Sequence, residues 1–310
     1  MFYVHSNRLI LEFTAIAYFF ALIVDVVFYI AGLAPGYIGG TTSVLVALWG
    51  FMRMWSVALT VSICLLLHGV SVKSWLSSKL SFKRKVILYY FTAPLIIYFA
   101  LGVYVAIAYP LGLFDFNAYV DVIREYLSST SLGGRVRDVA WIIAIAQIIQ
   151  AYIAAVTVNA LAALGEEIGW RGYLFELLGG ATSLKKTVII GVLWGLWHAP
   201  AILLMGYNYA YNRLLGVLLF TALTVVITYP HLYVTGNSGS LWPPSSLHGG
   251  INALWNLTLI ASRLPMEQRE ILLGLGAIGI LAWMVTDFTI IILSKAVKRR
   301  SRTANRLCTQ

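Results

Sequence analysis

The sequence predicts an all-α, polytopic membrane protein that folds as a bundle of about eight transmembrane helices. Of its 310 residues, 60% are hydrophobic and 11% are charged, whereas an ordinary soluble domain carries about 25% charged residues. Several apolar runs exceed the roughly 18 to 20 residues that a helix needs to cross the hydrocarbon layer. These runs of Leu, Ile, Val and Ala lack the alternation of a membrane barrel, so helices remain as the way to satisfy the backbone in lipid.

The apolar runs place eight spans along the chain. The predicted spans are 9–32, 42–68, 86–109, 139–165, 187–205, 213–235, 245–262 and 271–294. The first run is too long for the apolar region of a signal peptide, so it is interpreted as the first span.

The basic residues predict that both termini are cytoplasmic. With a cytoplasmic N-terminus, 15 Lys and Arg fall in inner segments and 6 in outer segments, as the positive-inside rule requires. An odd number of spans would separate the basic run 83–85 from the basic tail 295–306, so parity supports eight. The net charge of +10 is thereby explained by orientation in a cell membrane, with the lipid bilayer as surroundings and no nucleic-acid partner.

Two connecting segments have a distinctive composition. The outer segment 110–138 is predicted to hold a short amphipathic helix around Val120–Leu127. The segment Tyr229–Ser246 contains no Lys, Arg, Asp or Glu but has two glycines and a Pro-Pro pair. It is predicted to be an irregular loop that dips into the membrane against protein, where such backbone is tolerated.

Ionisable residues within spans are costly and therefore need an explanation. Glu12 lies near the inner end of the first span and is expected to snorkel to the interface. Asp25 and Arg53 lie at comparable depth in the first two spans and are expected to form a structural ion pair. His68 and His231 lie near predicted membrane boundaries and are expected to be hydrogen-bonded interfacial histidines.

Three clusters place Glu, His and Asn within or beside spans four, five and seven. They are Glu166-Glu167-Ile168-Gly169-Trp170-Arg171, Trp194-Gly195-Leu196-Trp197-His198 and His248-Gly249-Gly250-Ile251-Asn252. Any one cluster alone would be a weak signal, since a juxtamembrane turn, an interhelical hydrogen bond or close packing explains each of them. Their convergence on spans four, five and seven indicates one polar site inside the bundle.

Helical spacing separates the roles within the first cluster. Glu167 and Arg171 are i, i+4 neighbours with the acid first, the better order for an ion pair. Glu166 is turned about 100° away and is free to face the bundle. A carboxylate in an apolar bundle is suited to proton transfer. We therefore expect Glu166 to act in catalysis and the Glu167–Arg171 pair to support it.

The two histidine clusters supply the remaining groups. His198 lies in the middle of a span and could share a water molecule with Glu166 and activate it, because imidazole changes charge near neutral pH. His248 and Asn252 are i, i+4 neighbours after Ser245-Ser246, either of which could cap a helix start. This placement near a positive helix end predicts that His248 and Asn252 form an oxyanion hole.

The ordered motifs Glu-Glu-x-x-x-Arg at 166–171, aromatic-x-x-x-His at 194–198 and His-x-x-x-Asn at 248–252 resemble the CAAX protease and bacteriocin-processing family. This family includes the Ras-converting CAAX endopeptidases. The specific resemblance covers about residues 166–252. It implies eight helices, a water activated by Glu166 and His198, and a tetrahedral intermediate held by His248 and Asn252. Trp194 stands where the family usually has Phe. This departure affects the expectation for the shape of the substrate more than the expectation for the chemistry.

The sequence therefore predicts an intramembrane endopeptidase that hydrolyses membrane-associated peptide or protein substrates, with prenylated CAAX-type chains among the candidates. Residues 1–138 hold three helices and the outer loop, residues 139–265 a catalytic four-helix membrane core, and residues 266–310 the last helix and a basic cytoplasmic tail. No cofactor motif appears, and a metal-free Glu/His mechanism accounts for every group.

Two alternatives remain open at this stage. In the first, Glu166, His198 and His248 bind zinc in a membrane peptidase, since zinc accepts two histidines and a glutamate. In the second, the chain is a non-catalytic transporter or immunity-type protein, in which Asp25, Arg53 and Asp287 line one cavity with His198.

The catalytic interpretation carries a geometric condition. If span four left the membrane before Glu166, His198 would lie about 18 Å deeper, at 1.5 Å per helical residue. Span four must then tilt or start late for Glu166 and His198 to meet.

Overall fold

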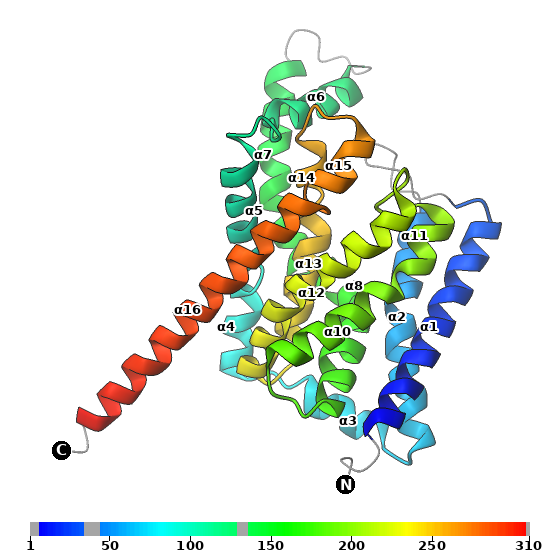
Figure 1. The fold of residues 1–310 in the computed structure, drawn as a ribbon, viewed down its shortest axis with the longest axis vertical. Coiled ribbons are helices and arrows are strands. Elements are labelled where there is room, and N and C mark those ends of the chain that lie inside the picture. Colours follow the sequence, from blue (N-terminus) through cyan, green and yellow to red (C-terminus); the bar gives the residue numbers. More distant parts are fainter. Residues whose placement is uncertain (1–5, 34–43, 129–135, 308–310) are drawn as a thin grey trace.

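The all-α prediction is confirmed by the structure, a computed structural model that describes residues 6–33, 44–128 and 136–307. Within these ranges the chain forms helices and connecting turns and contains no strand. The helices assemble side by side into a bundle (Figure 1).

Eight helical passages cross the bundle among the described residues. They are α1 (Ser6–Ile30), α2 (Val44–Leu67), α4 (Arg84–Thr92) with α5 (Leu95–Ala108), α7 (Val136–Ala155) with α8 (Val158–Glu167), α10 (Leu184–Trp197) with α11 (Ala199–Met205), α12 (Arg213–Ser238), α13 (Trp242–Leu254) with α14 (Leu257–Ile260), and α16 (Ala277–Leu307) after α15 (Met266–Leu272). Seven passages contain a helix long and apolar enough to span a membrane; α13 is shorter and is enclosed by its neighbours. α1 begins and α16 ends at the same end of the bundle, as an even number of spans requires (Figure 1).

Short helices cover the two ends of the bundle. α3 (Val72–Lys79) lies at the end where α1 begins, and α6 (Phe116–Leu127) lies at the opposite end (Figure 1). α6 confirms the amphipathic helix expected in the outer segment. Its first turn is capped by Asp115, whose carboxylate accepts a hydrogen bond from the Asn117 N–H at 2.9 Å.

The fourth passage differs from the single helix expected at 139–165. α7 ends at Ala155, Thr157 breaks the helix with φ −131° and ψ −107°, and α8 starts again at Val158. α8 continues into a π-helix, η2 (Ile168–Leu174), and α9 (Phe175–Leu177). Because the passage restarts, Glu166 lies inside the bundle, with 3% of its surface exposed. The late start of α8 is what the sequence analysis required for Glu166 to stay inside the membrane and meet His198.

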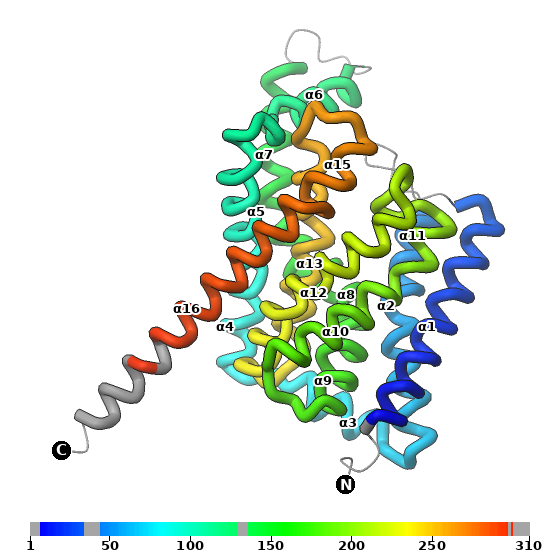
Figure 2. Tube along the Cα trace, in the orientation of Figure 1, coloured from blue at the N-terminus to red at the C-terminus, as the bar shows by residue number. Residues whose placement is uncertain are grey.

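The expectation of an irregular loop at Tyr229–Ser246 is wrong. α12 runs through Pro230 to Ser238, and α13 starts at Trp242, so only a short turn separates them (Figure 2). Gly239 ends α12 in the left-handed conformation, with φ 74°, which glycine adopts without steric cost. The segment lacks charged residues because most of it is buried between helices.

The expected cap of α13 is also wrong. The capping position is Leu241, so Ser245 and Ser246 already lie within the helix and cap nothing. Their hydroxyls instead donate to Leu241 O and Tyr90 O, each at 2.7 Å. The two prolines that follow Trp242 occupy the first turn, where a missing N–H leaves no hydrogen bond unmade.

Close contact between α13 and α8 fixes the position of the second histidine cluster. A Cβ added to Gly249 would lie 2.7 Å from Ala160 N, and therefore only glycine permits this approach. The short distance brings His248, the neighbour of Gly249, next to the end of α8 that carries Glu166 and Glu167.

Candidate active site

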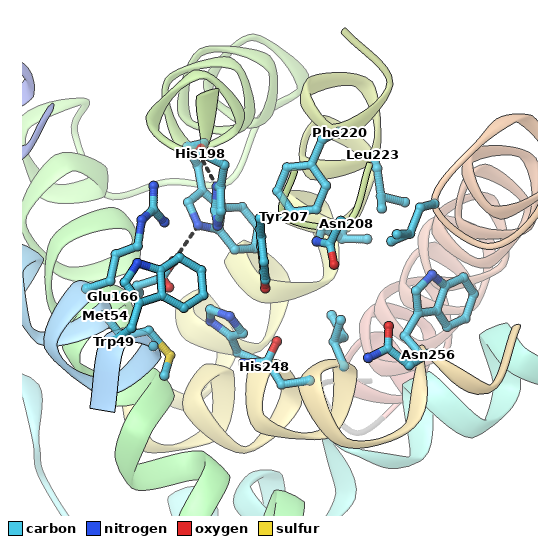
Figure 3. A pocket seen from close by; sticks show the side chains of 18 residues that line it. Trp49, Met54, Glu166, His198, Tyr207, Asn208, Phe220, Leu223, His248 and Asn256 are labelled. Carbon is cyan, nitrogen blue, oxygen red and sulfur yellow. Dashed lines mark hydrogen bonds between the residues drawn. The ribbon is translucent and has the colours of Figure 1, made fainter. Parts of the chain in front are cut away.

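A cavity of about 160 Å³ lies among α2, α8, α10, α12 and α13 and is also lined by the loop between α11 and α12. Figure 3 shows Glu166, His198 and His248 around it, with Phe220 and Asn256 farther along. All four residues expected to act in catalysis line this cavity. Its polar lining comprises Arg53, Glu166, His198, Asn208, His248, Asn252 and Asn256.

Glu166 presents its carboxylate to the cavity from the last turn of α8. Its Oε2 accepts a hydrogen bond from Trp194 Nε1 at 2.5 Å. From the sequence, Trp194 was expected to affect the shape of the substrate that fits, and it was not identified as a hydrogen-bond donor. The indole N–H helps to hold the carboxylate in place, because hydrogen bonds to charged acceptors are stronger than neutral ones.

Glu167 and Arg171 form the expected ion pair, with Nη1 and Oε1 2.9 Å apart and both side chains fully buried. The guanidinium also lies over the Trp194 ring, 4.0 Å from its centroid. An additional contact was not expected: His248 Nδ1 lies 2.8 Å from the same Glu167 Oε1. The pair therefore connects α8 and η2 to the histidine of α13.

His198 is held at the end of α10 with a defined tautomer. Its Nδ1 lies 2.9 Å from Trp194 O. Since a carbonyl oxygen only accepts, the partner indicates that Nδ1 carries the hydrogen, and in the neutral ring Nε2 then has a free lone pair. The ring is fixed edge-on against Phe220 and stacked with Tyr207, at centroid distances of 4.6 and 6.4 Å. Tyr207 was not identified from the sequence.

His248 and Asn252 lie one helical turn apart and both line the cavity. His248 is 4% exposed, whereas Asn252 is exposed to the cavity and makes no side-chain hydrogen bond within the described ranges. The predicted placement of these residues near the positive end of a helix is wrong: His248 is the seventh of 13 residues in α13, and Asn252 lies in its last turn. Their donor groups, rather than the helix dipole, must then stabilise negative charge.

Asp25 and Arg53 form the expected ion pair, with Nε 2.9 Å from Oδ1. Arg53 also donates from Nη2 to Trp197 O at 2.6 Å and lies 3.8 Å from the centroid of the Trp197 ring. Trp197 ends α10 beside His198, so the ion pair supports the position of that histidine. Among the described residues, the cavity is lined by Arg53 but not by Asp25 or Asp287, which does not match the pathway expected for a transporter.

The predictions for the other two histidines had different outcomes. His68 pairs with Glu12 at 3.0 Å, with both side chains partly exposed, in keeping with an interfacial histidine and a snorkelling acid. His231 is not interfacial but fully buried, and its ring lies 6.0 Å from that of Trp194 and 5.9 Å from that of His248. It was predicted to be interfacial because the sixth span was expected to end nearby, at residue 235.

The residues best placed to hold a metal are not the expected ones. Possible ligand atoms of Glu167, His231 and His248 lie within 4.8 Å of one another, whereas Glu166 and His198 are absent from this group. The His231 Nδ1 faces Ile227 O at 2.6 Å, which leaves Nε2 buried without a partner among the described residues. However, Arg171 Nη1 already lies 2.9 Å from Glu167 Oε1. A divalent cation bound to Glu167 would therefore lie close to the positive charge of Arg171, which repels it. The donor set thus fits a metal poorly.

The chain is similar to known proteins over part of its length. The family described as "Type II CAAX prenyl endopeptidase Rce1-like" matches residues 148–254. The "CAAX prenyl protease 2" of Methanococcus maripaludis is 51% identical over 43 residues, which cover 14% of this chain and 16% of that protein. The matched family region contains Glu166, His198, His248 and Asn252. The match to the Rce1-like family of CAAX prenyl endopeptidases covers residues 148–254 and therefore most of the polar lining of the cavity.

Proposed function

We propose that this chain is a CAAX-type intramembrane endopeptidase that cleaves membrane-associated substrates, prenylated chains included, with a water molecule activated by Glu166 and His198. The observation that carries the proposal is the meeting of Glu166, His198, His248 and Asn252 in one cavity enclosed by helices. The family match over residues 148–254 supports a peptidase.

In the proposed first step, the Glu166 carboxylate removes a proton from water while the lone pair on His198 Nε2 accepts a hydrogen bond from it. The water oxygen bonds to the substrate carbonyl carbon, and the carbonyl electron pair moves to its oxygen. In the second step, the tetrahedral intermediate collapses, the C–N bond breaks, and the proton held by Glu166 passes to the leaving nitrogen. Such proton transfer contributes about 10²- to 10⁴-fold to a rate.

The negative oxygen of the intermediate would be held by Asn252 Nδ2 and His248 Nε2. Because His248 Nδ1 faces Glu167, His248 donates from Nε2 only when both ring nitrogens are protonated. The buried Glu167 carboxylate stabilises that cation, and Arg171 holds the carboxylate in position. Each donor directed at a developing oxyanion is worth about 10²- to 10³-fold in kcat.

The proposed location is a cell membrane, crossed several times, with both termini in the cytoplasm. It rests on the 15 to 6 distribution of Lys and Arg and on the seven apolar helices of spanning length. A lipid bilayer would present an anchored substrate to the cavity from the side or from the cytoplasmic face.

A zinc peptidase is the alternative to be tested: Glu167, His231 and His248 lie close enough together to share an ion, although the positive charge of Arg171 beside Glu167 opposes one. Metal analysis of the purified, active protein separates the two mechanisms. Full activity without bound transition metal would reject zinc, whereas activity proportional to zinc content would reject the metal-free mechanism.

The proposed function is tested by cleavage of a fluorogenic farnesylated peptide by the full chain in lipid nanodiscs. Glu166→Ala should retain the fold and lose cleavage by at least about 10²-fold. The matched control is Glu176→Ala, because Glu176 pairs with Lys79 outside the cavity, and this variant should cleave as the wild type does. Unchanged turnover by Glu166→Ala would contradict the proposal.

A further inference from the structure

A row of three polar side chains extends the candidate site along one face of α13. His248, Asn252 and Asn256 are each four residues apart, and all three line the cavity. The helical course persists beyond the end of α13, since Trp255 has φ −65° and ψ −25° and Asn256 has φ −61° and ψ −21°. Four residues of helix advance about 6 Å, so the row places hydrogen-bonding groups at that interval.

The part of the opposite wall that α12 contributes is apolar. Phe220, Leu223 and Ile227 line it. Figure 3 shows Phe220 and Leu223, with Asn208 beside them, on the side of the cavity opposite His248 and Asn256. The cavity therefore has a polar edge on α13 and, facing it, a wall on which the apolar side chains of α12 predominate.

This geometry matches an extended peptide. Successive residues of an extended chain rise about 3.3 Å, so groups on one edge recur every two residues at about 6.6 Å. That interval is close to the spacing of the row on α13. Asn252 and Asn256 are both exposed, and neither makes a side-chain hydrogen bond to another described residue. Each amide can donate to a peptide carbonyl and accept from a peptide N–H.

We propose that Asn256 is a substrate-binding residue that, together with Asn252, pairs with the backbone of a substrate held extended along α13. With Asn252 at the scissile carbonyl, Asn256 contacts the peptide group two residues away. The substrate class is a chain that is extended beside the scissile bond and turns apolar side chains toward Phe220 and Leu223. This inference rests on the proposed endopeptidase function.

The test combines a variant with modified substrates. Peptides carry a single ester in place of one peptide group at each of the first three positions on either side of the scissile bond, which removes the N–H and weakens the carbonyl as an acceptor. For the wild type, the ester two residues from the scissile bond should lower kcat/KM about fivefold, the effect of one neutral hydrogen bond. Asn256→Ala should lower kcat/KM of the all-amide peptide by the same factor and show no further loss with that ester.

Controls separate binding from folding. Asn256→Ser also removes the amide and should reproduce the result if Asn256→Ala is poorly folded. Asn117→Ala changes an exposed asparagine of α6, outside the cavity, and should retain the wild-type ester profile.

Two results would overturn the inference. One is an unchanged kcat/KM for Asn256→Ala and Asn256→Ser. The other is an ester effect that persists in full in both variants. Wild-type protein that cleaves no peptide at all would instead contradict the endopeptidase function, a distinct outcome.

Discussion

His248 Nδ1 lies 2.8 Å from Glu167 Oε1, although 81 positions separate the two residues in the sequence. The same oxygen accepts a hydrogen bond from Arg171 at 2.9 Å. The neighbouring Glu166 instead contacts Trp194 and lines the cavity. Two adjacent glutamates thus have different partners: one faces the cavity, and the other ties the end of α8 to α13.

Replacing Glu167 should destabilise the protein. Glu167→Gln leaves the buried Arg171 guanidinium without a counter-charge, and breaking a buried pair costs roughly 3 to 5 kcal/mol. We expect a clear drop in the apparent Tm in detergent, together with lower activity, because His248 loses its partner. Glu176→Gln is the control: its side chain is 47% exposed, and such pairs contribute about 0 to 1 kcal/mol. Equal Tm values for the two variants would contradict this role of Glu167.

Replacing Asn252 should affect catalysis and spare stability. Asn252→Ala removes a donor proposed for the oxyanion hole, for which the expected loss in kcat is about 10²- to 10³-fold. Because the side chain makes no hydrogen bond to other described residues and faces the cavity, the Tm should change little. The measurement pairs peptide cleavage with thermal unfolding. A large drop in Tm with normal kcat in the remaining folded protein would assign Asn252 a structural role.

Replacing Gly249 should separate α13 from α8. In Gly249→Ala the new Cβ would lie 2.7 Å from backbone atoms of Asn159 and Ala160, and overpacking of this kind costs about 1 to 3 kcal/mol. His248 would move away from Glu167, so both Tm and cleavage should fall. Gly102→Ala in α5 meets no atom within 4 Å and should be neutral or stabilising, since alanine is favoured over glycine in a helix by about 0.5 to 1 kcal/mol. Similar behaviour of the two variants would show that the contact is not tight.

The attachment of α6 should resist acid. The hydrogen bond from Arg263 at 2.9 Å is the main cause that holds the pKa of Asp115 below its usual range. A lowered carboxyl pKa stabilises the folded state above the unfolded value of about 3.9, and this stabilisation is lost as the pH falls through the lower, folded value. Hydrogen-exchange protection of α6 should therefore persist as the pH falls until it reaches the lowered pKa of Asp115 in the folded protein. In Arg263→Gln the loss should begin at a higher pH, and an identical pH profile would argue against the pairing.

The fold was predictable where the signal is local. The lengths of the apolar runs predicted the transmembrane spans, because each spanning helix must satisfy its own backbone hydrogen bonds within the hydrocarbon layer. The amphipathic stretch Val120–Leu127 predicted α6, because its pattern is also local to the helix. The prediction failed at Tyr229–Ser246, since glycine, proline and uncharged residues occur both in loops and in helices buried within a bundle. His231 was predicted to be interfacial because the sixth span was expected to end nearby.

The amino-acid sequence alone predicts that the protein crosses a membrane as helices and that Glu166, His198, His248 and Asn252 are polar groups of one bundle. The contacts between atoms became known from the folded structure: Trp194 with Glu166, Glu167 with His248, and the ring of His231 with that of His248. Helix formation depends on neighbours within a few residues, whereas the rotation and depth of one helix against another depend on contacts between distant segments, such as Gly249 against α8.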